Sequence, residues 1–141
     1  MTDIERLIAA EEIKQLKARY FRCMDTKQWP GWEDVFTADA VMDVSEEQVS
    51  QSVIKGRDKI IPFVSKVLEG VVTVHHGHMP EIEVTSETTA RGIWSMEDKL
   101  RWPDGKTTLH GYGHYHETYE KVDGRWRIKT LKLTRLRIDR T

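Results

Sequence analysis

The chain has 141 residues, of which 38% are hydrophobic and 32% are charged. This length and composition predict one globular domain spanning residues 1–141 and exclude intrinsic disorder. Because 22 Lys and Arg residues nearly balance 23 Asp and Glu residues, the charge predicts neither a nucleic-acid partner nor a membrane-surface partner. A single cysteine excludes an internal disulfide framework, and no apolar run is long enough to span a bilayer. The charged N-terminus lacks a signal-peptide core, so we expect a cytoplasmic protein.

Three helices are expected in the first half of the chain. Residues 3–25 carry apolar side chains at spacings of three and four, which is the period of an amphipathic helix. Pro30 suits the first turn of a short second helix that continues to about Phe36. A third helix is expected between Gly56 and Gly70, because apolar residues recur on one side of it and glycine is a common stop.

Strands dominate the remainder of the chain. Residues 40–54 predict a short strand and a loop. Beyond the third helix, β-branched or alternating segments predict strands at residues 71–76, 81–85, 88–102, 107–122 and 126–138. Turn signals such as Asp123-Gly124 separate the later strands. Helices followed by an antiparallel meander predict an α+β fold, in which a curved sheet wraps around the helices and leaves a pocket between them.

One strand face carries a carboxylate in an apolar setting. At a period of two, Asp98 shares its face with Trp94 and Met96. Burying Asp98 without a partner would cost on the order of several kcal/mol. Arg135 and Arg137 follow two leucines on one face of the last strand, and an Asp98–Arg135 pair would satisfy both charges. The alternative is a bulge that places Asp98 in solvent.

Three further polar residues are candidates for a site. Asp25 stands in the last turn of the first helix, where the helix dipole disfavours a negative charge; the alternative is that it faces solvent beside Lys27. Tyr20 belongs to the apolar stripe of that helix, and its simplest interpretation is a core aromatic. His75 follows the buried-looking run 71–74 and could act as a base near neutral pH if a carboxylate orients it. Its simplest interpretation is a structural histidine.

The strand at residues 107–122 has two distinct faces. One face carries three histidines and a tyrosine: His110, Tyr112, His114 and His116. His-x-His along a strand can bind a metal, but packing is the simpler explanation, and we predict no metal site. The other face carries Gly111, Gly113, Tyr115 and Glu117, and its two glycines leave space as a ligand cavity would. The chain has no glycine-rich phosphate loop, and we predict no cofactor.

Several segments resemble a known family. Ile13–Asp25, Phe36–Ala40 and Tyr119–Ile128 are similar to the SnoaL-like group of the nuclear-transport-factor superfamily, which is related in fold to scytalone dehydratase, polyketide cyclases and a dehydrochlorinase. More narrowly, His75–Ile82 and Gly92–Leu100 resemble the bacterial bile acid 7α-dehydratases. The resemblance implies a cone-shaped antiparallel sheet around the N-terminal helices and a homotrimer, with a dimer as the alternative.

The resemblance also implies a set of site residues. The catalytic residues of the bile acid enzymes fall on Tyr20, Asp25, His75, Asp98 and Arg135. We expect the substrate pocket to include Trp94, Met96, Gly113 and Tyr115. The second catalytic histidine of scytalone dehydratase has no counterpart, which argues against scytalone as the substrate.

The resemblance implies a cofactor-independent dehydratase that acts on a hydroxylated, carbonyl-bearing hydrophobic molecule such as a steroid or bile acid. His75 would remove a proton, Asp25 would hold its tautomer, and Tyr20 would donate a hydrogen bond to the enolate oxygen or the leaving hydroxyl. Asp98 and Arg135 would position the substrate or pair with each other. The alternatives are an isomerase or polyketide cyclase with the same pocket, a dehydrohalogenase, and a non-catalytic protein that binds hydrophobic ligands.

Overall fold

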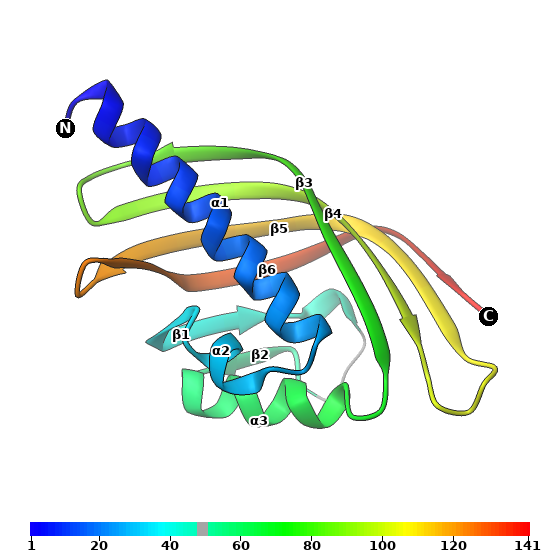
Figure 1. Ribbon diagram of the computed structural model, residues 1–141. Helices are drawn as coiled ribbons and strands as arrows, with labels where there is room; N and C mark the ends of the chain where they lie inside the picture. Colours follow the sequence, from blue (N-terminus) through cyan, green and yellow to red (C-terminus); the bar gives the residue numbers. More distant parts are fainter. Residues whose placement is uncertain (48–50) are drawn as a thin grey trace.

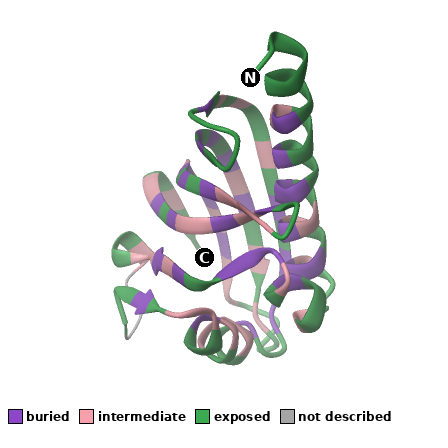
Figure 2. Ribbon diagram, turned by 90° about the vertical axis from the view of Figure 1, so that its left-hand side faces the viewer, coloured by how far each residue is buried: buried purple, intermediate pink, exposed green. Residues whose placement is uncertain are grey.

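The helical spacing at the start of the chain forms the long helix α1 (Asp3–Asp25) in the computed structural model, which describes residues 1–47 and 51–141. The Thr2 hydroxyl caps this helix by accepting a hydrogen bond of 3.1 Å from the Glu5 N–H. One stripe of the helix, from Ala9 to Met24, is buried against the sheet, as the purple bands in Figure 2 show. The predicted helix is confirmed at both ends.

Two shorter helices complete the helical layer. α2 (Trp29–Glu33) has a proline in its first turn, and α3 (Arg57–Val67) follows a glycine, as expected. α2 ends three residues before the predicted end at Phe36, because Phe36 already begins a strand opposite Ile128. Its ring packs edge-on against Trp32 in the core, with the ring centroids 4.9 Å apart.

Six strands form one sheet in the order β2-β1-β6-β5-β4-β3. The first two strands are β1 (Phe36–Asp43) and β2 (Val53–Lys55). The meander consists of β3 (Val72–Val84), β4 (Thr89–Arg101), β5 (Thr108–Val122) and β6 (Arg125–Arg140). Figure 1 shows α1 crossing the face of the meander, with α2, α3, β1 and β2 gathered beside its last turns.

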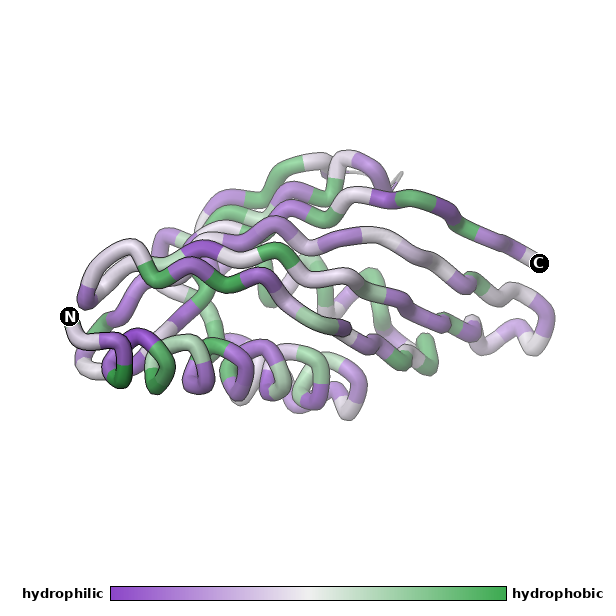
Figure 3. Tube along the Cα trace, turned by 90° about the horizontal axis from the view of Figure 1, so that it is seen from above, coloured by the Kyte–Doolittle hydropathy of each residue, from purple (hydrophilic) through white to green (hydrophobic). Residues whose placement is uncertain are grey.

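The curvature of the sheet is visible from above in Figure 3, where the strands arch over α1. Its concave face packs against the helices around an aromatic core that includes Tyr20, Trp32, Phe36 and Tyr115. The predicted α+β fold with a curved sheet around the N-terminal helices is confirmed. Among the described residues, no helix combines the length and the apolarity needed to cross a membrane.

Two details of the sheet differ from the prediction. β1 pairs with β6 in parallel, whereas the sequence predicts antiparallel strands. A parallel pair needs a long connection, and β2, α3 and the first three strands of the meander lie between β1 and β6 in the chain. The predicted strands 71–76 and 81–85 form the single strand β3, which is bulged between His78 and Glu81. Val72 and Val74 are exposed on the convex face, so the run before His75 is not buried throughout.

Candidate active site

His75 and Asp25 form a closely bonded pair where the end of α1 meets β3. The His75 Nδ1 lies 2.6 Å from the Asp25 Oδ1, and the His75 backbone N–H donates to Oδ2 at 2.8 Å. The Thr73 hydroxyl donates a further hydrogen bond of 2.9 Å to Oδ1. Because the carboxylate accepts the Nδ1 proton, Nε2 of the neutral imidazole is left with its lone pair free. Asp25 therefore faces the histidine and not solvent beside Lys27.

Asp98 lies opposite His75 in the β3–β4 register and is 3% exposed. Its Oδ2 is 3.7 Å from the His75 Nε2. Arg135 donates hydrogen bonds of 2.8 and 3.0 Å to the two Asp98 oxygens, which confirms the predicted pair. The sequence missed Glu47, which receives two more hydrogen bonds from Arg135, at 2.9 and 2.6 Å.

The guanidinium of Arg135 is fully occupied by the protein. Of its five N–H groups, two donate to Asp98 and two donate to Glu47. The fifth points to the Met96 sulfur, which lies 3.7 Å from the Arg135 Nη1. Burial opposes the charge, but the hydrogen bonds that Arg135 donates to Asp98 and Glu47 raise the pKa of Arg135 above its ordinary value. Of the two predicted roles, pairing with Asp98 is the one that this geometry shows.

Arg137 does not share the face of Arg135, contrary to the alternation of the sequence. β6 has an extra residue where Gly113 pairs with Arg135 and Tyr112 pairs with Arg137. This bulge turns Arg137 to the convex face, where its side chain is 70% exposed and bonds Asp139.

A cavity of about 530 Å³ opens beside these groups. Of the seven polar residues that line it in the described part of the chain, six form what we call its polar end: Tyr20, Glu47, His75, Asp98, Tyr115 and Arg135. The seventh, Arg140, lies five residues beyond Arg135 on β6. Side chains of α3 and of the end of β4 supply much of its apolar wall, including Phe63, Val64, Val67, Leu100 and Trp102. The cavity therefore combines an apolar body with a few polar groups at one end, as small-molecule sites do.

Three predicted pocket residues do not line this cavity, whereas Tyr115 does. The Trp94 indole N–H donates to the Tyr119 hydroxyl at 2.9 Å, and Met96 lies against Arg135. A side chain at Gly113 would overlap the carbonyl oxygen of Thr134, so this glycine serves a close approach of two strands. The expectation that the two glycines leave open space is wrong, because a Cβ at Gly111 would collide with the Asp98–Arg135 pair.

Gly113→Ala should lower the free energy of unfolding by about 1–3 kcal/mol, because the methyl group can only be placed by shifting the β5–β6 backbone. Urea denaturation measures the change. His114→Ala, at the next residue on the convex face, is the control and should have a smaller effect. Unchanged stability in Gly113→Ala would contradict the close approach.

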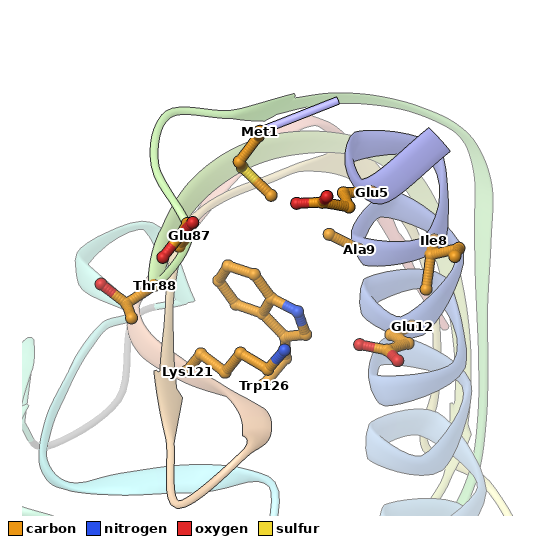
Figure 4. A pocket seen from close by; sticks show the side chains of 9 residues that line it. All are labelled: Met1, Glu5, Ile8, Ala9, Glu12, Glu87, Thr88, Lys121 and Trp126. Carbon is orange, nitrogen blue, oxygen red and sulfur yellow. The ribbon is translucent and has the colours of Figure 1, made fainter. Parts of the chain in front are cut away.

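A second hollow, of about 380 Å³, lies at the other end of α1. Figure 4 shows Glu5 and Glu12 on the helix side of this hollow. The ring of Trp126 lies between them and two residues of the sheet: Glu87 from the turn between β3 and β4, and Lys121 from the end of β5. None of the predicted site residues lines this hollow. Glu12, the lining residue nearest to Asp25 along α1, is roughly 20 Å from it at a rise of 1.5 Å per helical residue. The hollow is therefore not part of the His75 site.

The sequence analysis also missed a buried ion pair next to the cavity. The Lys17 ammonium donates a hydrogen bond of 2.6 Å to the Glu117 Oε2, and both side chains are fully buried. The Tyr119 hydroxyl donates to the other Glu117 oxygen at 2.7 Å. A signal was present, since Lys17 is four residues from Ile13 and three from Tyr20 on the buried stripe of α1.

The two cavity tyrosines keep their protons. Burial, with the charge of Glu117 adding to it, raises the pKa of Tyr20 far above its ordinary value. Burial likewise raises the pKa of Tyr115 well above its ordinary value. Both hydroxyls can therefore act as neutral hydrogen-bond donors across the physiological pH range.

The histidines of β5 lie on the convex face, away from the cavity. The His110 Nε2 is 3.0 Å from Glu97, and the His116 Nε2 is 3.1 Å from the Thr134 hydroxyl. Within residues 1–47 and 51–141, no group of three or more His, Cys, Asp or Glu side chains is arranged to hold a metal ion.

The chain belongs to the SnoaL-like domain family, whose model matches residues 5–132. The chain is also similar to the probable cyclase FGR4 of Gibberella zeae, with 24% identity over 138 residues that cover 91% of each protein.

Solved structures with this fold include a candidate scytalone dehydratase from Novosphingobium aromaticivorans, with a TM-score of 0.85 and 22% identity over 94% of this chain and 87% of that one. The hexachlorocyclohexane dehydrochlorinase LinA-type3 from Novosphingobium barchaimii has a TM-score of 0.85 and 20% identity, over 99% and 94% of the two chains. These likenesses support the fold, and the match to the SnoaL-like domain family supports the predicted superfamily.

Proposed function

We propose that the protein is a cofactor-independent dehydratase that removes water from a hydroxylated, carbonyl-bearing hydrophobic molecule. The observation that carries this proposal is the His75–Asp25 pair at 2.6 Å, placed at the polar end of an apolar cavity. A base with an oriented tautomer is what proton abstraction next to a carbonyl requires. The names of the relatives, a probable cyclase, a candidate dehydratase and a dehydrochlorinase, support an enzyme that converts small molecules.

The proposed reaction begins with proton removal by His75. Nε2 takes a proton from a carbon that a conjugated carbonyl has made acidic, and the electron pair of the C–H bond forms an enolate. Asp25 stabilises the resulting imidazolium through Nδ1. The enolate electrons then form the new carbon–carbon double bond as the C–O bond breaks. The hydroxyl leaves as water with the proton that His75 carried.

The other polar residues have distinct roles in this proposal. Tyr20 donates a hydrogen bond to the oxygen that becomes negative, because it lines the cavity and stays protonated. Asp98, fixed by Arg135, stabilises the imidazolium from the side of Nε2. Arg135 acts through Asp98 and Glu47, because it has no N–H group left for a substrate.

We further propose a steroid or bile acid as the substrate. The cavity volume of about 530 Å³ is within the roughly 300–1,000 Å³ of typical small-molecule sites. Its wall is mostly apolar, which suits a rigid hydrocarbon skeleton with few polar groups. The resemblance of His75–Ile82 and Gly92–Leu100 to the bile acid dehydratases supports the same class.

Absorbance measurements test this function directly. A 7-hydroxy-3-oxo-4-ene steroid or bile acid should absorb at longer wavelength after incubation with the protein, because loss of water extends the conjugation. Mass spectrometry of the product should show the loss of one water molecule. A ligand that binds without either change would rule out dehydration of that substrate.

The similarity to a probable cyclase supports a second candidate, a cyclase or isomerase that uses the same base without loss of water. Such a product keeps the mass of the substrate, so the same mass measurement separates the two reactions.

The homotrimer that the resemblance implies stays a prediction. Light scattering checks it, and a monomeric mass would contradict it.

A further inference from the structure

Lys17 is a buried cation that the proposed reaction does not use. Its side chain is fully buried in the middle of α1 and is held by Glu117 of β5 at 2.6 Å. Its nitrogen lies 3.7 Å from the centroid of the Tyr20 ring and 3.5 Å from that of the Tyr115 ring. Both of these tyrosines line the cavity. Lys17 itself does not, so any effect on a bound molecule must pass through the two rings.

Stability alone gives little reason for such a pair. The desolvation of two charges commonly offsets their attraction, so apolar residues of similar size often serve a buried position as well or better. The arrangement has a different effect on the tyrosines. A cation against the face of an aromatic ring stabilises negative charge on that ring, and the effect is larger where water is excluded.

We propose that Lys17 is a positioning residue that strengthens the Tyr20 and Tyr115 hydroxyls as hydrogen-bond donors to an oxyanion in the cavity. Its ammonium, fixed by Glu117 against both rings, favours the charge that each phenol oxygen gains as it donates its proton more fully. The Glu117 carboxylate opposes that charge, and the ammonium outweighs it because it lies directly over the two rings. The inference rests on the proposed function in one respect, since it takes the oxyanion to be the enolate of the bound substrate.

The ionisation of Lys17 gives the proposal a pH signature. Burial lowers the pKa of Lys17 to about 8, against the opposing effect of Glu117. The titratable groups that face its nitrogen are Glu117 and Tyr115 of β5 and Tyr20 of its own helix. The charged form is the one that assists the tyrosines, so kcat should fall as the pH rises through about 8.

The deciding variant removes both members of the ion pair. Lys17→Met alone leaves the Glu117 carboxylate buried without its partner, and it can fail to fold. Lys17→Met/Glu117→Gln removes both charges of this pair, and the amide oxygen can still accept from Tyr119. We expect this double variant to unfold at nearly the wild-type urea concentration. Its kcat should be about 10- to 30-fold lower with KM within about twofold, and its activity should no longer fall near pH 8.

Lys14→Met is the control, because Lys14 lies about one turn before Lys17 on the same helix but is exposed. It should keep the wild-type kcat and pH profile. A folded double variant with wild-type kcat, or with an unchanged fall near pH 8, would overturn the proposal. That outcome would leave Lys17 a purely structural residue.

A binding measurement separates this inference from the proposed function. 4-Nitrophenol presents an oxygen that can become negative, whereas 4-nitrotoluene has a similar size and no such oxygen. The double variant should bind 4-nitrophenol about tenfold more weakly and 4-nitrotoluene unchanged. Equal losses for both ligands, or a wild type that binds 4-nitrophenol no better than 4-nitrotoluene, would contradict the role of Lys17. If the wild type dehydrates nothing, the proposed function is wrong, but this comparison still decides the inference.

Discussion

His75→Ala should lower kcat for the proposed dehydration by about 10²- to 10⁴-fold, which is the usual contribution of a general base. The variant removes the nitrogen that faces Asp98, while the backbone N–H at this position can still bind Asp25. The fold should therefore persist, and KM should change much less than kcat. The absorbance assay on the 7-hydroxy-3-oxo-4-ene substrate measures the effect.

His76→Ala is the matched control for this variant. His76 is the next residue of β3, but it is exposed on the convex face. Its replacement should leave kcat within about twofold of the wild type. Full activity in His75→Ala would contradict the assignment of the base, whatever reaction the protein performs.

Arg135→Leu should lower the free energy of unfolding by about 3–5 kcal/mol, as measured by urea denaturation. The substitution leaves Asp98, with a side chain 4% exposed, and Glu47, at 17%, without their shared cation. A buried carboxylate without a partner is the costly outcome. Adding Asp98→Asn to the variant should restore part of the loss, because it removes the more deeply buried charge.

The neighbouring Arg137→Leu provides the comparison. Arg137 is two residues away on the same strand, but its side chain is 70% exposed and its ion pair with Asp139 is in solvent. Surface ion pairs contribute about 0–1 kcal/mol, so this variant should be close to the wild type. Equal losses in the two variants would contradict the bulge that separates their side chains.

The sequence predicts those parts of the structure that depend on regular spacing. The period of α1 and the alternation of β4 and β5 are each visible along the chain, and they identify the apolar face on which Asp98 lies. The Asp98–Arg135 pair could be predicted because a buried charge needs a partner. The single-domain extent stays a prediction.

Other parts of the site depend on irregularities and on distant contacts. The bulge in β6 turns Arg137 outward, and no alternating pattern reveals one extra residue. Glu47 reaches Arg135 across 88 residues of sequence from a short 3₁₀ turn. The sequence does not distinguish a glycine that allows two strands to approach closely, as Gly113 does, from a glycine that leaves space for a ligand. Lys17 is the exception, since its place on the apolar stripe of α1 could have revealed it.

The parallel pairing of β1 with β6 bears on the order in which the protein assembles. The meander from β3 to β6 needs only contacts between neighbouring strands, which close short loops and form early. The pairing of β1 with β6 instead brings Phe36 opposite Ile128, which closes a loop that spans most of the chain. Met42 of β1 and Glu47 just beyond it belong to the cavity wall, so the cavity is incomplete until this strand has docked. A folding intermediate that consists of the meander alone would thus have a largely complete sheet and no binding site.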